Sequence, residues 1–469
     1  MSLIIPANSA SAAGGYAVDN SLRFNKASSD FLKRTPSSNG SKTTNTISLW
    51  VKRGNLSGGT VQRLFSQLDT GGAGNPDDYI TFADNDTFIF QFYGNGSSGV
   101  NNGLLTTNRK FRDTSAWYHI VAVQDTTNGT SGDRLRIYIN GVRETSFSSS
   151  TYPSQNTQGG AINNTSYPLF LGQRGNSAGY FDGYMAEVVF IDGQALTPTS
   201  FGEFDEDSGI WKPIDVSDLT FGTNGFYLDF EDSAALGDDV SGNGNDFTVN
   251  NLTATDQSTD TCTNNFATLN PLNVNPSSAG DAFTEGNLKL ATSNNSNSAG
   301  STATMAFTKG KWYAEVKYTS ATAWNGVMPT DATINGDTGR MNWYQGRTLY
   351  LSGSNTANWG SNVSAGDIVG IALDMDNSRV TISQSGQWWG GSSFNQAQPH
   401  TFQALISGYD TWTFLCASGS GTSTSEWNFG SPPFAISSGN QDANGYGNME
   451  FSVPTDYFIC NTKNLSEYG

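Results

Sequence analysis

Short segments of alternating apolar and polar residues, separated by turn clusters, run along most of this chain. In residues 134–140 (RLRIYIN), every second residue from Leu135 to Ile139 is apolar. This period of two predicts a β-strand with one buried and one solvent-facing side. Asn140 and Gly141 follow at the end of that strand and predict a tight hairpin turn. No segment keeps a 3.6-residue apolar period over ten or more residues, so we expect very little helix.

The pattern predicts an all-β protein with two antiparallel β-sandwiches of the jelly-roll type. We expect their inner faces to be apolar and their outer faces to be solvated. The turn clusters and the change in composition between the two sandwiches predict a turn-rich connector with a few strands. The expected parts are an N-terminal arm (1–14), a first sandwich (15–213), the connector (214–281) and a second sandwich (282–469).

Composition and charge narrow the class of partner. The chain has 469 residues, and its 24 basic and 42 acidic residues give a net charge of −18. An acidic surface repels phosphate backbones and anionic lipids, so we expect no binding of nucleic acid. No stretch approaches the roughly 20 apolar residues of a membrane span, and the start lacks a basic region followed by a long apolar run. We therefore expect neither membrane insertion nor a signal peptide.

Several segments of the first sandwich resemble the laminin-G/concanavalin-like jelly roll. The resemblance covers about 200 residues and implies the fold, whereas this fold carries many functions. It places Trp50 and Trp117 on core strands, so we expect both to be buried. The matching segments are 47–52 (ISLWVK), 117–123 (WYHIVAV), 135–142 (LRIYINGV), 181–190 (FDGYMAEVVF) and 192–198 (DGQALTP).

The second sandwich resembles the SPRY (B30.2-like) module. Residues 310–318 (GKWYAEVKY) are similar to its opening strand, and 365–374 (AGDIVGIALD) with 376–383 (DNSRVTIS) are similar to its central hairpin. The closing segment 428–430 (NFG) agrees with that module. This resemblance implies a second two-sheet sandwich over about 185 residues.

The order of the two modules, together with 241–247 (SGNGNDF) and 265–271 (NFATLNP), resembles proteins of tailed bacteriophages, especially marine ones. That resemblance implies a virion structural protein exposed on a capsid or a tail fibre. Residues 1–14 carry no charged side chain, and their apolar patch is Leu3, Ile4, Ile5 and Pro6. We expect this patch to attach the protein to other virion subunits, or to dock back onto its own first sandwich.

No catalytic constellation is apparent, so we expect a protein without enzymatic activity. The two histidines, His119 and His400, lie in neighbourhoods that suggest no Ser/His/Asp arrangement. Residues 203–207 (EFDED) carry carboxylates at alternate positions, as the acid and nucleophile of some glycosidases do. They follow the expected closing strand, however, and we interpret them as a solvated loop.

Aromatic residues near Asn- and Gly-rich turns are the remaining candidates for ligand binding. Sugars stack on aromatic rings while polar groups take their hydroxyls. The alternative is a role in the core, and of Trp388 and Trp389 we expect one buried and one exposed. The candidates are Trp324, Trp343, Tyr344, Trp359 and Trp389.

Metal binding is indicated only weakly. The loop 238–246 offers the carboxylates of Asp238, Asp239 and Asp246, and hard oxygen ligands suit Ca²⁺. The loop lacks the spacing of an EF-hand, so a solvated turn is the favoured interpretation and no other cofactor is expected.

The three cysteines form no CxxC pair, and we interpret them as small buried apolar residues. They are Cys262, Cys416 and Cys460.

Taken together, these features favour a non-enzymatic protein of the virion surface, either a capsid decoration or a short fibre. Its expected partners are virion subunits, further copies of itself as a homo-oligomer, and glycans of a host surface or of the environment. The alternatives are a carbohydrate-cleaving depolymerase on a concanavalin-like fold and a bacterial surface adhesin.

Overall fold

The computed structural model describes residues 15–56, 59–69, 76–94, 102–175, 177–275, 280–292, 300–320, 322–334, 338–418 and 422–469. Nearly all regular structure in these residues is β-strand, as the alternating pattern predicts. The one α-helix among them, α1 (Thr462–Tyr468), follows Asn461, whose side chain accepts a hydrogen bond from the backbone N–H of Asn464 at 2.9 Å. Within this described part, no helix is long and apolar enough to cross a membrane.

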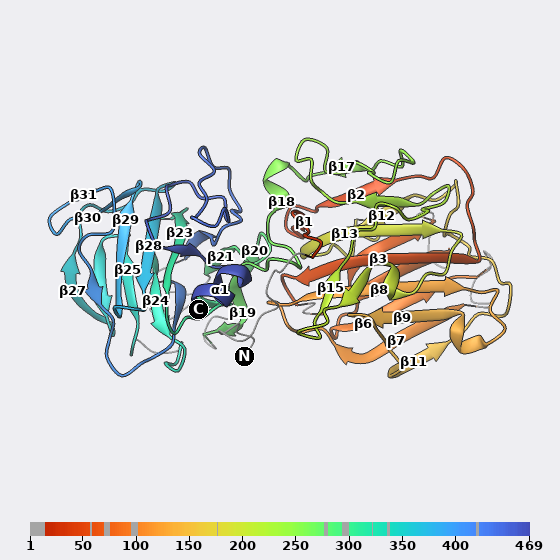
Figure 1. Ribbon diagram of the computed structural model, residues 1–469, viewed down its shortest axis with the longest axis horizontal. Helices are drawn as coiled ribbons and strands as arrows, with labels where there is room; N and C mark the ends of the chain where they lie inside the picture. Colours follow the sequence, from red (N-terminus) through yellow and green to blue (C-terminus); the bar gives the residue numbers. More distant parts are fainter. Residues whose placement is uncertain are drawn as a thin grey trace. The chain divides into compact units, whose positions relative to one another are not determined.

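The chain divides into two compact units, and the first ends at Thr263. Two large antiparallel sheets form most of this unit, which Figure 1 shows in red to green. We call them sheet one and sheet two. In spatial order, sheet one contains β10 (Val142–Arg143), β9 (Leu135–Ile139), β8 (Trp117–Asp125), β3 (Thr44–Arg53), β13 (Gly183–Asp192), β1 (Ser21–Phe24) and β18 (Gln257–Ser258), with β16 (Phe226–Leu228) paired to β13.

Sheet two faces sheet one across the main core of the first unit. Its described strands, in order, are β11 (Phe147–Thr151), β7 (Gly103–Lys110), β6 (Thr87–Phe92), β5 (Asp77–Phe82), β4 (Gln62–Leu68), β12 (Leu169–Leu171), β2 (Phe31–Arg34) and β17 (Thr248–Asn250). Leu49 and Ile120 of sheet one pack in this core with Phe65 and Phe90 of sheet two. The apolar residues of β9 point into it, while Arg136 and Tyr138 between them stay partly exposed, which confirms the predicted alternation.

Three of the segments that resemble the concanavalin-like fold lie side by side, since β3 pairs with β8 on one edge and with β13 on the other (Figure 1). Trp50 and Trp117 are buried, as expected. Both rings lie on the outer face of sheet one, however, in a cluster with Val18, Tyr184 and Trp211. The prediction of burial is confirmed, whereas the expectation of a solvated outer face is wrong for this sheet.

The outer face of sheet one is buried because it carries apolar side chains and the chain folds back over it. Val121 and Val189 of the sheet pack there against Phe201 and Phe221. The covering segment includes the 3-10 helix η2 (Pro198–Ser200), the hairpin β14 (Gly202–Phe204) and β15 (Trp211–Pro213), and the 3-10 helix η3 (Ala254–Asp256).

The same segment extends the first unit beyond residue 213, where we expected the first sandwich to end. Strands β16, β17 and β18 lie in residues 214–263 and pair with β13, β2 and β1, so this stretch completes the two sheets of the first unit. The structure therefore differs from the expected connector over 214–281, because its strands find partners in the preceding sandwich. The second unit begins at Asn264.

The second unit is also a two-sheet sandwich. Its sheet three contains β19 (Leu269–Val274), β22 (Gly300–Ala303), β33 (Trp412–Ser418), β24 (Ala323–Pro329), β25 (Met341–Tyr344), β26 (Thr348–Leu351) and β27 (Ser354–Asn358). Sheet four contains β20 (Ala282–Thr284), β21 (Lys289–Thr292), β34 (Ser423–Asn428), β23 (Lys311–Tyr318), β28 (Ile368–Asp374), β29 (Arg379–Gln384), β30 (Gln387–Trp389) and β31 (Phe394–Gln396). At its sides, β32 (Gln403–Ala404) pairs with β29, and β35 (Phe458–Ile459) pairs with β23 in parallel. The predicted strand–turn–strand is the β28–β29 hairpin.

The outer face of sheet four is covered by the C-terminal segment of the chain. Trp388 packs there against Met449 and Tyr457. Glu315 lies fully buried beneath this segment and accepts hydrogen bonds from the backbone N–H groups of Glu450 and Phe451, at 2.9 and 2.8 Å. Burial raises the pKa of this carboxyl group.

Candidate functional site

Three of the aromatic residues predicted to bind a ligand are core residues. Trp343, Trp359 and Trp389 pack in the core between sheets three and four, and the rings of Trp359 and Trp389 stack with centroids 5.5 Å apart. The prediction is wrong for these three, because their rings are buried in the core and not available to a ligand at the surface. The expectation that one of Trp388 and Trp389 is exposed is also wrong, since both faces of sheet four are covered.

Trp324 and Tyr344 lie together on the outer face of sheet three. The Trp324 ring is 8% exposed and lies 5.4 Å from that of Tyr344 and 4.4 Å from that of Tyr350, centroid to centroid. The two tyrosines are half-buried. Trp324 is therefore largely covered, and only the tyrosines present much of their rings at this surface.

The carboxylates proposed as calcium ligands are used within their own loop. Asp239 accepts hydrogen bonds from the backbone N–H groups of Tyr227, Ser241 and Asn245, at 2.8 to 3.0 Å. Asp246 accepts one from the backbone of Asp239 at 3.0 Å, and Asp238 is exposed. N–H groups directed at these oxygens would repel a cation, so the loop does not fit Ca²⁺. Within the described ranges, no group of three His, Cys, Asp or Glu side chains could hold a metal ion.

The acidic run 203–207 forms an exposed hairpin end. Lys212 makes ion pairs with Glu203 at 3.3 Å and with Asp205 at 3.2 Å. Hydrogen bonds from the backbone and hydroxyl of Ser208, and then from Lys212, lower the pKa of Asp205 to about 2. A carboxyl group with so low a pKa holds no proton to donate as a general acid.

The proposed attachment residues Leu3, Ile4, Ile5 and Pro6 lie outside the described residues.

Two of the three cysteines, Cys416 and Cys460, are buried, as expected. Cys262 has an intermediate exposure. Burial of its sulfur atom raises the pKa of the Cys262 thiol.

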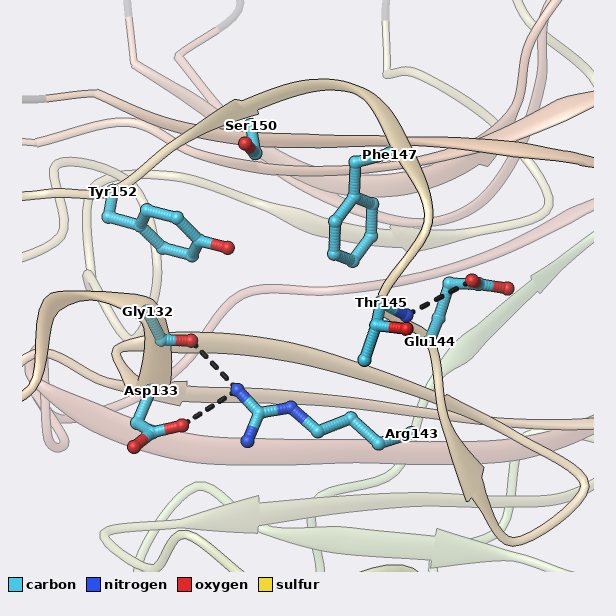
Figure 2. A pocket seen from close by; sticks show the side chains of 8 residues that line it. All are labelled: Gly132, Asp133, Arg143, Glu144, Thr145, Phe147, Ser150 and Tyr152. Carbon is cyan, nitrogen blue, oxygen red and sulfur yellow. Dashed lines mark hydrogen bonds and ion pairs between the residues drawn. The ribbon is translucent and has the colours of Figure 1, made fainter.

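An open cleft of about 410 Å³ lies in the first unit, between β10 and β11. These are the outermost described strands on one side of sheets one and two, so the cleft follows the open edge of the sandwich. Figure 2 shows Phe147 and Tyr152 on one side of it and Arg143 with Asp133 on the other. Its lining residues are Gly132, Asp133, Arg143, Glu144, Thr145, Phe147, Ser150 and Tyr152.

Charged side chains in and beside the cleft are paired. Arg143 makes an ion pair with Asp133 at 2.7 Å and donates a hydrogen bond to the carbonyl of Gly132 at 2.9 Å (Figure 2). Glu144 is buried and makes an ion pair with Arg109 of β7 at 3.1 Å. Two arginines and two carboxylates therefore balance one another around the cleft.

The aromatic walls of the cleft come from the two ends of β11. Phe147 begins this strand, and Tyr152 directly follows it. Both side chains are half-buried, because they pack partly against the main core of the first unit. Each ring is thereby held by the core while part of it remains at the surface.

The hairpin turn at Asn140 and Gly141 positions the other side of the cleft. Both residues have positive φ, 49° and 78°, as this type of turn requires. A Cβ atom on Gly141 would lie 2.3 Å from Cε3 of Trp211, so only glycine fits. The turn sets β10 against β9 and brings Arg143 back to Asp133, which precedes β9 in η1 (Ser131–Asp133).

This cleft was not predicted from the sequence, because the aromatic residues predicted to bind a ligand lie beside Asn- and Gly-rich turns of the second sandwich. One signal was present, namely the run from Phe147 to Tyr152, in which two aromatic residues flank four hydroxyl-bearing residues. The pairing of β11 with β7, which completes the cleft, joins segments about 40 residues apart and has no local signature.

Comparison with known proteins supports the fold of the first unit. Residues 27–200 match the family model Laminin_G_3, described as the concanavalin A-like lectin/glucanases superfamily. This stretch is a concanavalin A-like domain. It contains the whole cleft and lies within the first unit. No curated protein matches the chain.

Solved structures with some similarity include three proteins of different kinds. The SPRY domain of human HERC1 has a TM-score of 0.27 and 13% identity, over 34% of this chain and 96% of that one. A heptameric SAP-like pentraxin from Limulus polyphemus has a TM-score of 0.27 and 13% identity, over 38% and 78%. A putative carbohydrate binding protein from Bacteroides ovatus has a TM-score of 0.29 and 14% identity, over 45% and 56%. Similarities at this level carry no argument about the chain.

Proposed function

We propose that this protein binds carbohydrate without cleaving it, and that the cleft between β10 and β11 is the binding site. The observation that carries the proposal is the cleft itself, with aromatic walls and hydrogen-bonding groups on a domain of the lectin/glucanase superfamily. Its volume lies toward the small end of the roughly 300–1,000 Å³ of small-molecule sites, which suits one or two sugar rings.

The side chains of the cleft match the two kinds of surface on a sugar. The apolar face of a ring would stack on Tyr152 or Phe147. Its hydroxyl groups would exchange hydrogen bonds with Asp133 and Arg143, which offer an acceptor and donors 2.7 Å apart. Because the charges around the cleft balance and the whole chain carries −18, we propose a neutral saccharide rather than a uronate or a sulfated sugar.

The arrangement of carboxylates favours binding over hydrolysis. A glycosidase needs one carboxyl group that donates a proton and a second that acts as nucleophile or base. The carboxylates of the cleft, Asp133 and Glu144, are each engaged by an arginine. Glu203 and Asp205 share Lys212 on an exposed hairpin. A depolymerase is the alternative function, and assays of polysaccharide hydrolysis distinguish it from a binding protein.

The test of the cleft is a comparison of glycan binding by matched aromatic variants. The full-length protein is screened on an array of neutral, uronate-bearing and sulfated glycans, and the affinity for the best ligand is measured by calorimetry. Tyr152→Ala and Phe147→Ala should lower that affinity at least tenfold, because stacking area is lost. Tyr350→Ala, a half-buried tyrosine of sheet three, should leave it unchanged. Equal affinity in the wild type and both cleft variants would refute the assignment.

We further propose that the protein is displayed on a virion surface, as its resemblance to tailed-bacteriophage proteins implies. In this proposal Leu3, Ile4, Ile5 and Pro6 attach it to other virion subunits, and its sandwiches face outward. Free in water, such a segment gains nothing from ordering that offsets roughly 1 kcal/mol of backbone entropy per residue. A neighbouring subunit that buries the apolar residues would supply that gain.

The attachment proposal is tested by deletion of residues 2–12. Folding is followed by circular dichroism of the soluble protein, and incorporation by its abundance in purified particles. Normal folding with lost incorporation supports the arm as an anchor. Unchanged incorporation would refute it.

A further inference from the structure

Three side-chain oxygens form a closed triangle on the outer face of sheet one. The Tyr227 hydroxyl lies 2.8 Å from Oε2 of Glu187, and the Tyr16 hydroxyl lies 3.2 Å from the same atom. The two hydroxyl oxygens are 3.0 Å apart. Glu187 is 6% exposed and Tyr227 is 4% exposed, so water contributes little to their hydrogen bonding.

The number of protons in this triangle depends on Glu187. Each phenol supplies one proton, so an ionised Glu187 leaves two protons for three oxygen–oxygen contacts. A protonated Glu187 supplies the third. Its O–H can then donate to Tyr16, which donates to Tyr227, which donates back to Oε2. Only the protonated carboxyl group therefore satisfies all three contacts.

The surroundings also favour the protonated form. Burial is the main cause that raises the pKa of Glu187 to about 7. Hydrogen bonds from Tyr227 and Tyr16 favour the ionised carboxylate and lower this pKa, whereas the charges of Asp229 and Glu231 raise it, and the effect of burial prevails. Burial raises the pKa of the Cys262 thiol, and the charge of Glu187 raises it further. On the other side of the triangle, burial and the charges of Glu187 and Asp215 raise the pKa of Tyr16.

The backbone directs Glu187 into this position. Its φ is 50°, which is uncommon for a residue with a side chain, and it lies where the pairing of β13 with β3 is interrupted between Ala186 and Val189. Bulges of this kind re-aim a side chain relative to its strand. Here the bulge directs the carboxyl group at the two tyrosines.

Tyr16 belongs to the first few described residues of the chain. Two residues later, Val18 exchanges hydrogen bonds with the Thr263 hydroxyl at 3.1 and 3.0 Å and packs in the outer-face cluster. The triangle and the Val18–Thr263 contact together hold the segment before β1 on sheet one.

We propose that Glu187, Tyr16 and Tyr227 form a proton-dependent latch, which fastens residues 15–18 to sheet one in acid and loosens as the pH rises to neutrality. The folded pKa of Glu187 lies above its ordinary 4.5. The latch is therefore complete below pH 4.5, weakens as the pH rises through about 7, and changes little above that.

Hydrogen exchange of the full-length protein tests the latch. Exchange of a peptide covering residues 16–20 is measured between pH 5 and pH 8 and corrected for the intrinsic effect of pH. In the wild type, the opening equilibrium should rise more than tenfold over this range. In Glu187→Gln, whose side chain does not titrate, it should stay constant. In Tyr16→Phe, which removes one oxygen of the triangle but leaves Glu187 buried, the pH dependence should be smaller than in the wild type.

Asp207→Asn, at an exposed carboxylate, is the matched control and should behave as the wild type does. A wild type without pH dependence would overturn the proposal. So would a pH dependence in Tyr16→Phe as large as that of the wild type. This variant removes only a hydroxyl group, so it tests the proposal even where Glu187→Gln fails to fold.

Discussion

The indole N–H of Trp211 donates a hydrogen bond of 2.9 Å to Nδ1 of His119, and this contact fixes the protonation state of the imidazole. An indole can only donate, so Nδ1 must carry no proton. The proton of the neutral ring is then on Nε2, which lies 2.9 Å from the Ser48 hydroxyl and donates to it. We expect the ¹⁵N chemical shifts of His119 to report this tautomer at neutral pH.

His119 should make the first unit sensitive to acid. Burial lowers its pKa from 6.5 to about 3. Its contribution to stability is therefore present above pH 6.5 and is lost as the pH falls toward 3, at up to about 1.4 kcal/mol per pH unit. Free energies of unfolding from urea titrations should fall more steeply with acid in the wild type than in His119→Asn, which keeps an acceptor for Trp211. Parallel profiles would contradict this. Glu187 has the opposite sign, and its effect cancels in the comparison.

Trp50 and Trp117 should be essential to the stability of the first unit. The Trp50 ring stacks on His119, with centroids 4.7 Å apart, and the Trp117 indole donates to Asp260 at 3.1 Å. Truncation of either residue to alanine should cost about 3–5 kcal/mol, since it empties a buried site. Urea unfolding measures the loss. Val142→Ala, at a side chain that is 57% exposed, is the control and should change stability by about 0.5 kcal/mol or less.

Trp343 and Trp359 should contribute to the stability of the second unit and not to ligand binding at its surface. Their rings contact each other in its core at 5.4 Å, so alanine at either position should cost about 3–5 kcal/mol. Tyr344→Ala, beside Trp343 but half-buried on the outer face, should cost clearly less. Full stability in Trp343→Ala would contradict the burial of this ring in the core.

No hydrolysis of polysaccharide is expected from this protein. Glu203 is exposed and Asp205 is partly exposed, both make an ion pair with Lys212, and the low pKa of Asp205 keeps it ionised at neutral pH. Release of reducing ends from neutral and acidic polysaccharides measures the activity. Hydrolysis that disappears in Glu203→Gln or Asp205→Asn would establish an enzyme in place of a binding protein.

Much of the local structure could be predicted from the sequence, because strand periodicity and turn chemistry act over a few residues. The alternation in β9, the turn at Asn140 and Gly141, and the β28–β29 hairpin are all where their residue patterns predict them. The all-β class and the concanavalin-like resemblance of 27–200 follow from the same short-range signals.

Only the tertiary structure decided which faces are covered. A period of two shows which residues share a face, but it does not show what packs against that face. The alternation around Trp50 is compatible with either side of sheet one as the core, and both sides are buried because residues 195–263 fold back over the outer one. For the same reason, the sequence predicts a ligand-binding role for Trp343 and Trp389, whose rings lie in the core.

The cleft likewise depends on long-range pairing. Asp133 and Arg143 are close in sequence, and a hairpin turn explains why they meet. Phe147 and Tyr152 reach the opposite wall only because β11 pairs with β7 in the other sheet. Local residue patterns determine the elements of this protein, whereas the burial of apolar surface between distant segments determines where its sites lie.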